Sequence, residues 1–562
     1  MDCRRNIVTS ICALALLLLL LMPLAHLLSA GGEDKADYDA EHMILPMLAL
    51  LEKAPQVVAQ TPVEPMIDIE EAWAIEDTRE ERWQTPLVTA MRYGENEMGF
   101  DAESNTFYCS LGMESGDDWP ELQFFAAAED DKNLRVAWID DYSYDYCQDA
   151  IRDGNRYELI AYTDTEYAYF GMVFTGLPLV TLHTHCGREM IDDEYMPARA
   201  GISASGYEAV HSGIWIHQRG GGYDKGNDKE SYRIEFHEQS GGRDKKKDIS
   251  LLGMEADSDW LLISNNSDVT GMRNHLCWEL WNKWNQDREA PFLLKSHMVE
   301  VFIDDEYRGM YQLMQRVDEE KEIEQIGGDV QTDYLYRIIR SIGIEERPVY
   351  HGGLRWYELR HKPNGISEKR QFDKILSYIE MNKPIEDDHF IQLVNRCVDV
   401  PALMNYFAFM QAADLGYENV DNNVYIFALL QEDGRYLYQL APWDMDNALP
   451  GGQGTAAEVA GMNLMMRMPY HILNLDIQES RRIYYEIWHE KRQTILSDDA
   501  LYQWFEYWES YINHSGAYAR ESEKWWGGAT ELSLQVFSAN MIYSMGVMDR
   551  EMYDLWPYGE RE

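Results

Sequence analysis

Two short segments in the second half of the sequence carry side chains suited to binding a metal and moving a proton. Asp421 and Asn423 precede a predicted strand, and Asp444 and Asp446 follow the strand after it. Two carboxylates two positions apart, held between a Pro-Trp pair and a glycine-rich exit, can point to the same side. Such hard oxygen ligands suit Mg²⁺ or Mn²⁺ bound together with phosphate oxygens. Asp421 could then accept a proton and Asn423 could add a metal ligand, although a solvated acidic turn would give the same pattern.

A glycine-rich turn between two predicted strands forms a candidate phosphate site. Arg219 ends the first strand, three glycines follow it, and Lys229 opens the second strand. Glycines let the backbone approach phosphate oxygens, and a lysine just beyond them can reach the same oxygens. The GxGxxG spacing is absent, and Arg219 or Arg233 could take the phosphate in place of Lys229. A plain hairpin with a solvated lysine is the alternative.

Arg273 and Asn274 lie in the first turn of a predicted helix, Asp268–Asn285. A guanidinium and the amides of a helix start can bind a phosphate group. An arginine that bridges the helix and a sheet would explain the same residues. Elsewhere, His183 and His185 alternate on one predicted strand, but no further metal ligand is near them in sequence. The HExxH motif of zinc metalloproteases is also absent.

The elements that must position these residues change character along the chain. Residues 31–85 are acidic and contain several prolines, which predicts a tether or a loosely attached helix. Short aromatic runs broken by turn residues predict a small, sandwich-like β domain over residues 86–185. Strands and helices alternate in residues 186–562, and the last hundred residues are mostly helical in pattern. We therefore expect an α+β fold with a helical C-terminal part.

The first thirty residues resemble a targeting segment. Arg4 and Arg5 precede an apolar run, and small residues near Ala30 offer a cleavage point. Residues 1–30 are therefore predicted to be a secretory signal peptide, with an uncleaved membrane anchor as the alternative. In both cases the positive residues before the run place the rest of the chain outside the cytoplasm.

The net charge limits the partners. The chain has 98 acidic and 49 basic side chains and a net charge of −49. Phosphate backbones and anionic lipid surfaces would repel such a protein, so we expect no nucleic-acid partner and no membrane contact except through the predicted anchor. Cys109 and Cys147 could form a disulfide in this setting, or they could be ordinary buried thiols.

Eight segments in order along residues 200–455 resemble the spore coat protein CotH family. They are Lys229–Phe236, Leu251–Gly253, Asp259–Leu262, Ser267–Asp268, Met272–Asn274, Glu300–Ile303, Glu306–Tyr311 and Pro442–Asp446. That family has an atypical protein-kinase-like fold and contains secreted or spore-surface Ser/Thr kinases. The resemblance therefore implies ATP, Mg²⁺ or Mn²⁺, and a protein acceptor. A basic, Ser-rich acceptor would suit the charge of this chain.

The resemblance also implies roles for individual residues. Lys229 resembles the lysine that binds the nucleotide phosphates, and Asp444 resembles the metal-binding aspartate, with Asp446 beside it. The family often has the catalytic aspartate five positions before the asparagine that precedes the aromatic strand, and that position is Glu418 here. Asp421 is our candidate for the catalytic base, with Glu418 and Asp414 as rivals.

A second departure from the family pattern is Gln315, where the family commonly has glutamate. If that glutamate pairs with the lysine, its absence removes an ion pair that orients the phosphates. Together with Glu418, this departure supports an alternative to the kinase. The chain would then be a pseudokinase that acts as a structural or binding protein at the cell surface.

Overall fold

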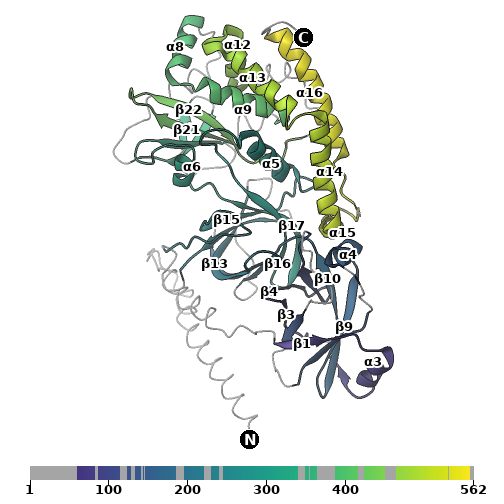
Figure 1. Ribbon diagram of the computed structural model, residues 1–562. Helices are drawn as coiled ribbons and strands as arrows, with labels where there is room; N and C mark the ends of the chain where they lie inside the picture. Colours follow the sequence, from purple (N-terminus) through teal and green to yellow (C-terminus); the bar gives the residue numbers. More distant parts are fainter. Residues whose placement is uncertain are drawn as a thin grey trace, which may run out of the picture. The chain divides into compact units, whose positions relative to one another are not determined.

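The computed structural model in Figure 1 describes most of the chain beyond residue 59. The described residues are 60–82, 86–113, 123–127, 133–140, 144, 146–184, 195–220, 229–238, 245–339, 349–352, 355–363, 386–415, 423–449, 464–529 and 531–556. The predicted signal peptide or anchor lies outside them, as do His185, Glu418 and Asp421. Contacts divide the chain into residues 1–47 and 48–562, so every described residue belongs to the second unit.

The first described part is a ten-stranded sheet with strand order β4-β3-β7-β1-β8-β9-β10-β6-β5, in which β2 pairs with β10. The strands are β1 (Thr61–Glu64), β2 (Glu80–Glu81), β3 (Ala90–Tyr93), β4 (Asn96–Glu97), β5 (Gly99–Asp101), β6 (Thr106–Ser110), β7 (Phe124–Ala127), β8 (Arg135–Trp138), β9 (Arg156–Tyr162) and β10 (Glu166–Thr175). Two short helices accompany them, α3 (Ile69–Glu76) and α4 (Cys147–Asp153). Buried aromatic side chains form the core, and Cys109 and Cys147 are buried without a disulfide between them.

Part of the segment predicted as a tether belongs to this sheet. Strand β1 pairs with β7 and β8, and α3 and β2 follow it within residues 31–85. The side chain of Asp68 caps α3 by accepting a hydrogen bond from the backbone N–H of Glu71 at 2.8 Å. Strand β1 has only four residues, so its pairing comes from its neighbours and not from a sequence pattern.

The second part is a closed barrel of seven strands in the order β11-β12-β13-β14-β15-β17-β16. They are β11 (Leu179–Thr184), β12 (Met196–Ser203), β13 (Val210–Arg219), β14 (Ser231–Phe236), β15 (Asp259–Ile263), β16 (Ser296–Ile303) and β17 (Glu306–Gln315). Alternating apolar residues such as Ile214, Ile216 and Ile234 fill its interior. Strands β16 and β17 form a hairpin in which Ile303 pairs with Glu306. Asp304 and Asp305 both have positive φ in its two-residue turn, as a hairpin of this type requires.

The third part is a five-stranded sheet with the order β19-β20-β18-β21-β22. Its strands are β18 (Tyr334–Ile339), β19 (Val349–Gly352), β20 (Arg355–His361), β21 (Val424–Leu430) and β22 (Tyr436–Pro442). Strands β21 and β22 form the hairpin between the two predicted metal-site segments, and Val424 pairs with Pro442 at its open end.

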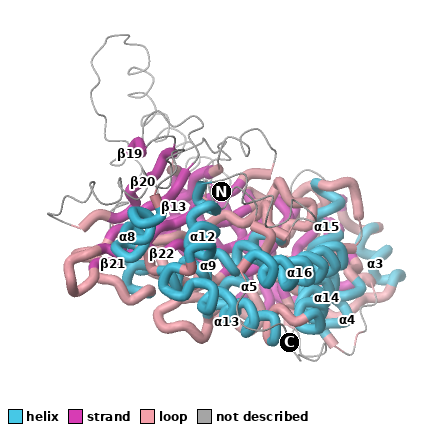
Figure 2. Tube along the Cα trace, turned by 90° about the horizontal axis from the view of Figure 1, so that it is seen from above, coloured by secondary structure: helices cyan, strands magenta, loops and turns pink. Residues whose placement is uncertain are grey.

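Helices make up most of the C-terminal part, as the sequence predicts. The helices beyond the barrel strands are α5 (Arg273–Asn285), α6 (Glu320–Gln325), α8 (Asp387–Cys397), α9 (Val400–Ala412), α12 (Leu464–Leu475), the 3-10 helix η3 (Ile477–Glu479), α13 (Ser480–Gln493), α14 (Asp498–His514), α15 (Ala517–Trp525) and α16 (Gln535–Leu555). Helix α9 packs on α13, and α14 packs on α16 (Figure 2). One large apolar core joins these helices to α5 and the five-stranded sheet. The fold is therefore α+β. Within the described residues, none of the helices has the length and apolar character needed to cross a membrane.

A buried cluster of polar side chains connects the end of β10, the barrel and α15. Arg520 donates two hydrogen bonds to the carboxylate of Glu300, each at 2.9 Å, and a third to the hydroxyl of Thr175. The hydroxyl of Tyr307 donates to the same carboxylate at 2.7 Å. Because Glu300 is fully buried, these bonds satisfy a charge that would otherwise be costly.

Candidate functional site

The β21–β22 hairpin brings Asn423 and Asp444 together. Asn423 lies directly before β21, and its carbonyl oxygen accepts a hydrogen bond from the backbone N–H of Trp443 at 2.9 Å. Asn423 and Asp444 have φ values of 55° and 53°, in the left-handed region that asparagine and aspartate tolerate better than most residues. The side-chain amide of Asn423 donates to Asp444 Oδ2 at 3.3 Å. Two of the predicted metal ligands are therefore in direct contact.

Arg337 on β18 fixes the other end of the Asn423 side chain. Its Nη2 donates to Asn423 Oδ1 at 3.3 Å, and its guanidinium carbon lies 6.0 Å from the centre of the Trp443 ring. The amide nitrogen of Asn423 thus faces Asp444, and its oxygen faces Arg337. No local sequence pattern marks Arg337 as a site residue, so its role is visible only in the structure.

Asn274 contacts the backbone between the two aspartates. Its Oδ1 accepts a hydrogen bond from the backbone N–H of Met445 at 2.9 Å, and its Nδ2 donates to Gln312 Oε1 at 2.8 Å. Asn274 is only 1% exposed. Both polar atoms of this predicted phosphate ligand are therefore used inside the protein, where they hold the segment that carries Asp444 and Asp446.

The loop between β15 and α5 has Asp268 as its centre. This carboxylate accepts hydrogen bonds from the backbone N–H groups of Thr270, Met272 and Arg273 at 2.9–3.0 Å. It also forms a salt bridge of 2.9 Å with the guanidinium of Arg273. That guanidinium lies 4.8 Å from the centre of the Phe537 ring. Arg273 therefore connects the loop, the start of α5 and helix α16, which matches the structural alternative for this residue.

Lys229 is buried, with 4% of its surface exposed, and it pairs with a residue near the C-terminus. Its Nζ donates to Glu521 Oε1 on α15 at 2.5 Å and to the carbonyl oxygen of Met310 at 2.7 Å. Glu521 Oε2 accepts a hydrogen bond from the backbone N–H of Met310 at 2.8 Å. Burial lowers the pKa of Lys229, and the Glu521 carboxylate opposes that shift. The lysine therefore has a carboxylate partner that the sequence analysis missed.

Gln315, at the position where the family commonly has glutamate, has a different contact. Its side-chain amide donates to the carbonyl oxygen of Glu255 at 3.2 Å, near the protein surface. Only the structure could have identified Glu521, because 292 positions separate it from Lys229.

The loop from Asn265 to Gly271 lies between Lys229 and the aspartates. Asn266 Nδ2 donates to the backbone carbonyl of Lys229 at 3.2 Å, and the hydroxyl of Ser267 donates to Asp446 Oδ2 at 2.8 Å. The backbone of the predicted phosphate lysine and the side chain of one predicted metal ligand, Asp446, therefore contact neighbouring residues of a single loop. Arg219 ends β13 opposite Ser231, two positions beyond Lys229.

The acids around the hairpin offer partial support for a divalent cation. Asp444 and Asp446 are both half-buried, and two carboxylates are a common protein contribution to a Mg²⁺ site that phosphate oxygens complete. Among the described residues there is no group of three or more His, Cys, Asp or Glu side chains that could hold a metal. The oxygens of Asp444 and Asp446 fit the cation. Asn423 fits less well, because its oxygen accepts from Arg337.

Of the three candidates for the proton acceptor, the structure describes Asp414 alone. Asp421 and Glu418 lie outside the described residues. Asp414 follows α9, close to the end of the described segment, and burial raises its pKa to about 6. At neutral pH a carboxyl with this pKa is mostly ionised, so Asp414 has the charge a proton acceptor needs.

A comparison with protein-family models matches residues 216–541, more than half of the chain, to the model described as "CotH kinase protein". The matched region begins in β13 and ends in α16, and it contains every residue predicted for the site. A search of curated proteins found no match.

Proposed function

Because the chain belongs to the CotH kinase protein family, we propose that it is a protein kinase that transfers the γ-phosphoryl group of ATP to Ser or Thr hydroxyls of a surface or coat protein. The proposal includes a kinase-like arrangement of the barrel, the five-stranded sheet and the C-terminal helices. The observation that carries it is the single loop that contacts Lys229 through Asn266 and Asp446 through Ser267. A kinase needs this neighbourhood of a phosphate-binding cation and metal-binding carboxylates.

In this proposal the residues have three roles: binding the nucleotide phosphates, binding the metal ion and positioning the metal ligands. Lys229 binds the nucleotide phosphates, and Glu521 keeps its ammonium charged and oriented. Asp444 and Asp446 hold Mg²⁺ or Mn²⁺, which neutralises negative charge on the phosphate oxygens when it is bound. Arg337 and Asn274 hold Asn423 and Met445, so the two aspartates enter the reaction already positioned.

The transfer exchanges one bond to the γ-phosphorus for another. The acceptor hydroxyl oxygen forms a bond to the γ-phosphorus, the bond from that phosphorus to the bridging oxygen breaks, and ADP leaves. Asp421 accepts the hydroxyl proton, with Asp414 and Glu418 as the other candidates. The net charge of −49 would draw a basic, Ser-rich acceptor toward the protein, and the N-terminal segment would place both outside the cytoplasm.

One observation favours a second candidate, a pseudokinase that binds a surface partner without transfer. The oxygen of Asn423 accepts from Arg337, so this side chain would have to change partner before it could bind a metal. Nucleotide binding without transfer would support this second candidate.

The experiment uses purified protein, γ-labelled ATP, Mg²⁺ or Mn²⁺, and a basic Ser-rich acceptor. We expect label transfer by the wild type and a loss of about 100-fold or more in Asp444→Asn, since this charge acts directly on the phosphates. Asp433→Asn is the matched control, because Asp433 is an exposed aspartate in the turn of the same hairpin and pairs with Arg435. Transfer that survives in Asp444→Asn refutes the assigned site. A protein that binds no nucleotide by calorimetry refutes the kinase proposal itself.

A further inference from the structure

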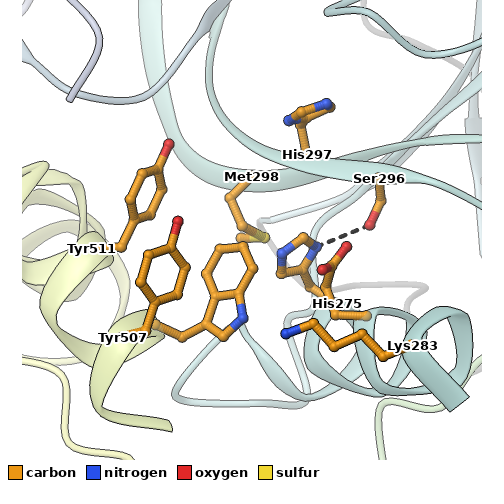
Figure 3. A pocket seen from close by; sticks show the side chains of 9 residues that line it. His275, Lys283, Ser296, His297, Met298, Tyr507 and Tyr511 are labelled. Carbon is orange, nitrogen blue, oxygen red and sulfur yellow. Dashed lines mark hydrogen bonds between the residues drawn. The ribbon is translucent and has the colours of Figure 1, made fainter. Parts of the chain in front are cut away.

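A cleft of about 510 Å³ lies along α5, between β16 and α14, and the proposed reaction does not use it. Figure 3 shows side chains from three elements around it. Helix α5 contributes His275, Glu279 and Lys283, strand β16 contributes Ser296, His297 and Met298, and helix α14 contributes Tyr507, Trp508 and Tyr511. Its volume falls in the range of small-molecule sites.

One wall of the cleft is aromatic. Tyr507 and Tyr511 are one helical turn apart on α14, and their rings stack with centres 6.0 Å apart. The ring of Trp508 lies edge-on to both, at 5.3 Å and 5.7 Å. Aromatic faces carry partial negative charge and attract cations.

The cleft also contains a carboxylate without a salt-bridge partner among the described residues. Glu279 forms no hydrogen bond or salt bridge with any residue in the described part of the chain, and burial raises its pKa. Lys283 follows one turn later, but its ammonium lies 5.8 Å from the centre of the Trp504 ring and makes no salt bridge with Glu279. Burial lowers the pKa of His275 to about 3 and also lowers the pKa of His297, so both rings are neutral at pH 7. A carboxylate and aromatic faces thus share a space in which Lys283 carries the positive charge, and that charge opposes the upward shift of the Glu279 pKa.

A chain of hydrogen bonds connects this cleft to the segment of the two aspartates. Met445 N–H donates to Asn274 Oδ1 at 2.9 Å, and Asn274 Nδ2 donates to Gln312 Oε1 at 2.8 Å. Gln312 Nε2 then donates to Ser296 Oγ at 3.0 Å, which lies 2.9 Å from His275 Nδ1 (Figure 3). Asn274 and Gln312 are almost completely buried, so water cannot readily substitute for these partners.

The direction of this chain follows from its first member. A backbone N–H can only donate, so it must face the oxygen of Asn274, and the amide of Asn274 must then face the oxygen of Gln312. Ser296 Oγ accepts from Gln312 Nε2, and among the described residues its hydroxyl proton has His275 Nδ1 as its acceptor. His275 is therefore neutral with its proton on Nε2, which is buried and has no hydrogen-bond partner in the described chain. The His275 ring lies edge-on to Trp508, with centres 4.6 Å apart.

We propose that the cleft binds a small organic cation through its ammonium group, and that binding is transmitted along this chain to Met445 between the two metal-site aspartates. The cation lies between the aromatic wall of α14 and Glu279. Contact with Trp508 restrains the ring against His275, the last member of the chain. Because every bond in the chain points the same way, each bond polarises and strengthens its neighbours. Occupancy of the cleft therefore tightens the hydrogen bond of Met445, whether or not the protein transfers phosphate.

The binding test uses calorimetry on the full chain with three probes. Choline carries the cation, 3,3-dimethylbutan-1-ol is its neutral isostere, and Nα-acetyl-lysine methylamide represents a lysine side chain of a peptide. We expect the isostere to bind about tenfold or more weakly than a cationic probe, since cation–π attraction and the carboxylate act only on the charge. The better of choline and the lysine amide identifies the source of the cation. No binding by either, or equal binding of choline and the isostere, overturns the proposal.

Two variants test the site. Glu279→Gln should weaken binding of the better cationic probe by about tenfold, because the amide keeps the shape and loses the charge. Glu506→Gln is the control, since it removes an exposed carboxylate from α14 that does not line the cleft, and its affinity should equal that of the wild type. An equal loss in both variants would mean that only the overall charge matters, which overturns the assigned site.

Hydrogen exchange tests the transmission without any assay of activity. The cationic probe should slow exchange in the peptide that contains Met445, and Gln312→Met should abolish that slowing while the cleft still binds the probe. Ser296→Ala breaks the same chain at the next bond, and it replaces Gln312→Met if that buried substitution prevents folding. Slowing that persists in a folded, probe-binding variant with a broken chain overturns the transmission.

Discussion

The pairing of Lys229 with Glu521 makes a strong prediction about stability. Both side chains are almost completely buried, with 4% and 2% of their surfaces exposed. Glu521 accepts hydrogen bonds from the lysine, from the Met310 backbone and from the Trp526 indole. Substituting Glu521→Gln removes the counter-charge and leaves the ammonium buried. Loss of one partner from a buried ion pair costs about 3–5 kcal/mol, so we expect the free energy of unfolding to fall by that order.

The measurement is urea denaturation at pH 7, followed by fluorescence, with two control variants. Glu523→Gln removes an exposed carboxylate from the same helix, and Gln315→Ala removes the side chain that the family pattern would pair with the lysine. Both controls should change the free energy of unfolding by no more than about 0.5 kcal/mol, as exposed substitutions usually do. The double variant Lys229→Met, Glu521→Gln should be more stable than the sum of its two single effects predicts, because no unpaired charge remains.

The pH dependence of Glu521→Gln provides an independent check. Without the carboxylate, burial acts unopposed and should lower the pKa of Lys229 further below its value in the unfolded chain. Between the two pKa values the unfolded chain binds more protons, so the stability of the variant should rise with pH toward the usual lysine pKa. A loss below about 1 kcal/mol at pH 7, or strict additivity in the double variant, would refute the assignment of Glu521 as the partner of Lys229.

Two further predictions concern buried titrating groups. Burial raises the pKa of Glu322 on α6 from 4.5 to about 8. Between these two pH values the folded protein therefore binds more protons than the unfolded chain. The free energy of unfolding should then fall by about 1.4 kcal/mol for each unit by which the pH rises across that window. Glu322→Gln should abolish this component in urea titrations at pH 5, 7 and 9, and an unchanged slope would contradict it. Burial lowers the pKa of His275 to about 3, so stability should decrease as the pH falls from 6.5 toward 3, because the unfolded chain then binds the proton. His275→Asn, whose side chain can still accept from Ser296, should show a shallower decrease between pH 6.5 and 4, and an equally steep one would contradict the assignment.

Local patterns predicted the parts of the site that are close in sequence. Asn423 and Asp444 flank one hairpin, so recognising the two strands was enough to bring the residues together. The contacts of Lys229, in contrast, cross the whole fold. Its partner Glu521 comes from a helix whose sequence shows only an amphipathic surface, and no short-range pattern connects the two.

The same limit applies to the fold. Alternating apolar residues mark several of the barrel strands, but the sequence does not show the parallel pairing of β11 with β16 that closes the barrel. Strand β1 was predicted as part of a tether, because four residues of mixed polarity have no pattern of their own. Asn274 was predicted to bind phosphate, whereas its side chain is used within the protein by Met445 and Gln312. The helix was predicted to begin at Asp268, but it begins at Arg273, because Asp268 caps the preceding loop. The direction of a side chain on it depends on elements that pack on the helix from elsewhere in the chain.

The adjacent residues Arg520 and Glu521 have a consequence for the order of events during synthesis. Arg520 neutralises Glu300 beside the end of β10, and Glu521 neutralises Lys229 in the barrel. Glu300 and Lys229 leave the ribosome long before α15 is synthesised, because 220 and 292 residues separate them from Arg520 and Glu521. Domains generally fold in order from the N-terminus during synthesis, but this barrel cannot complete its ionic contacts until almost the whole chain exists. A nascent chain or a fragment that stops before Ala517 therefore carries two uncompensated charges in its interior, and its barrel is a target for proteases and chaperones until the last helices arrive.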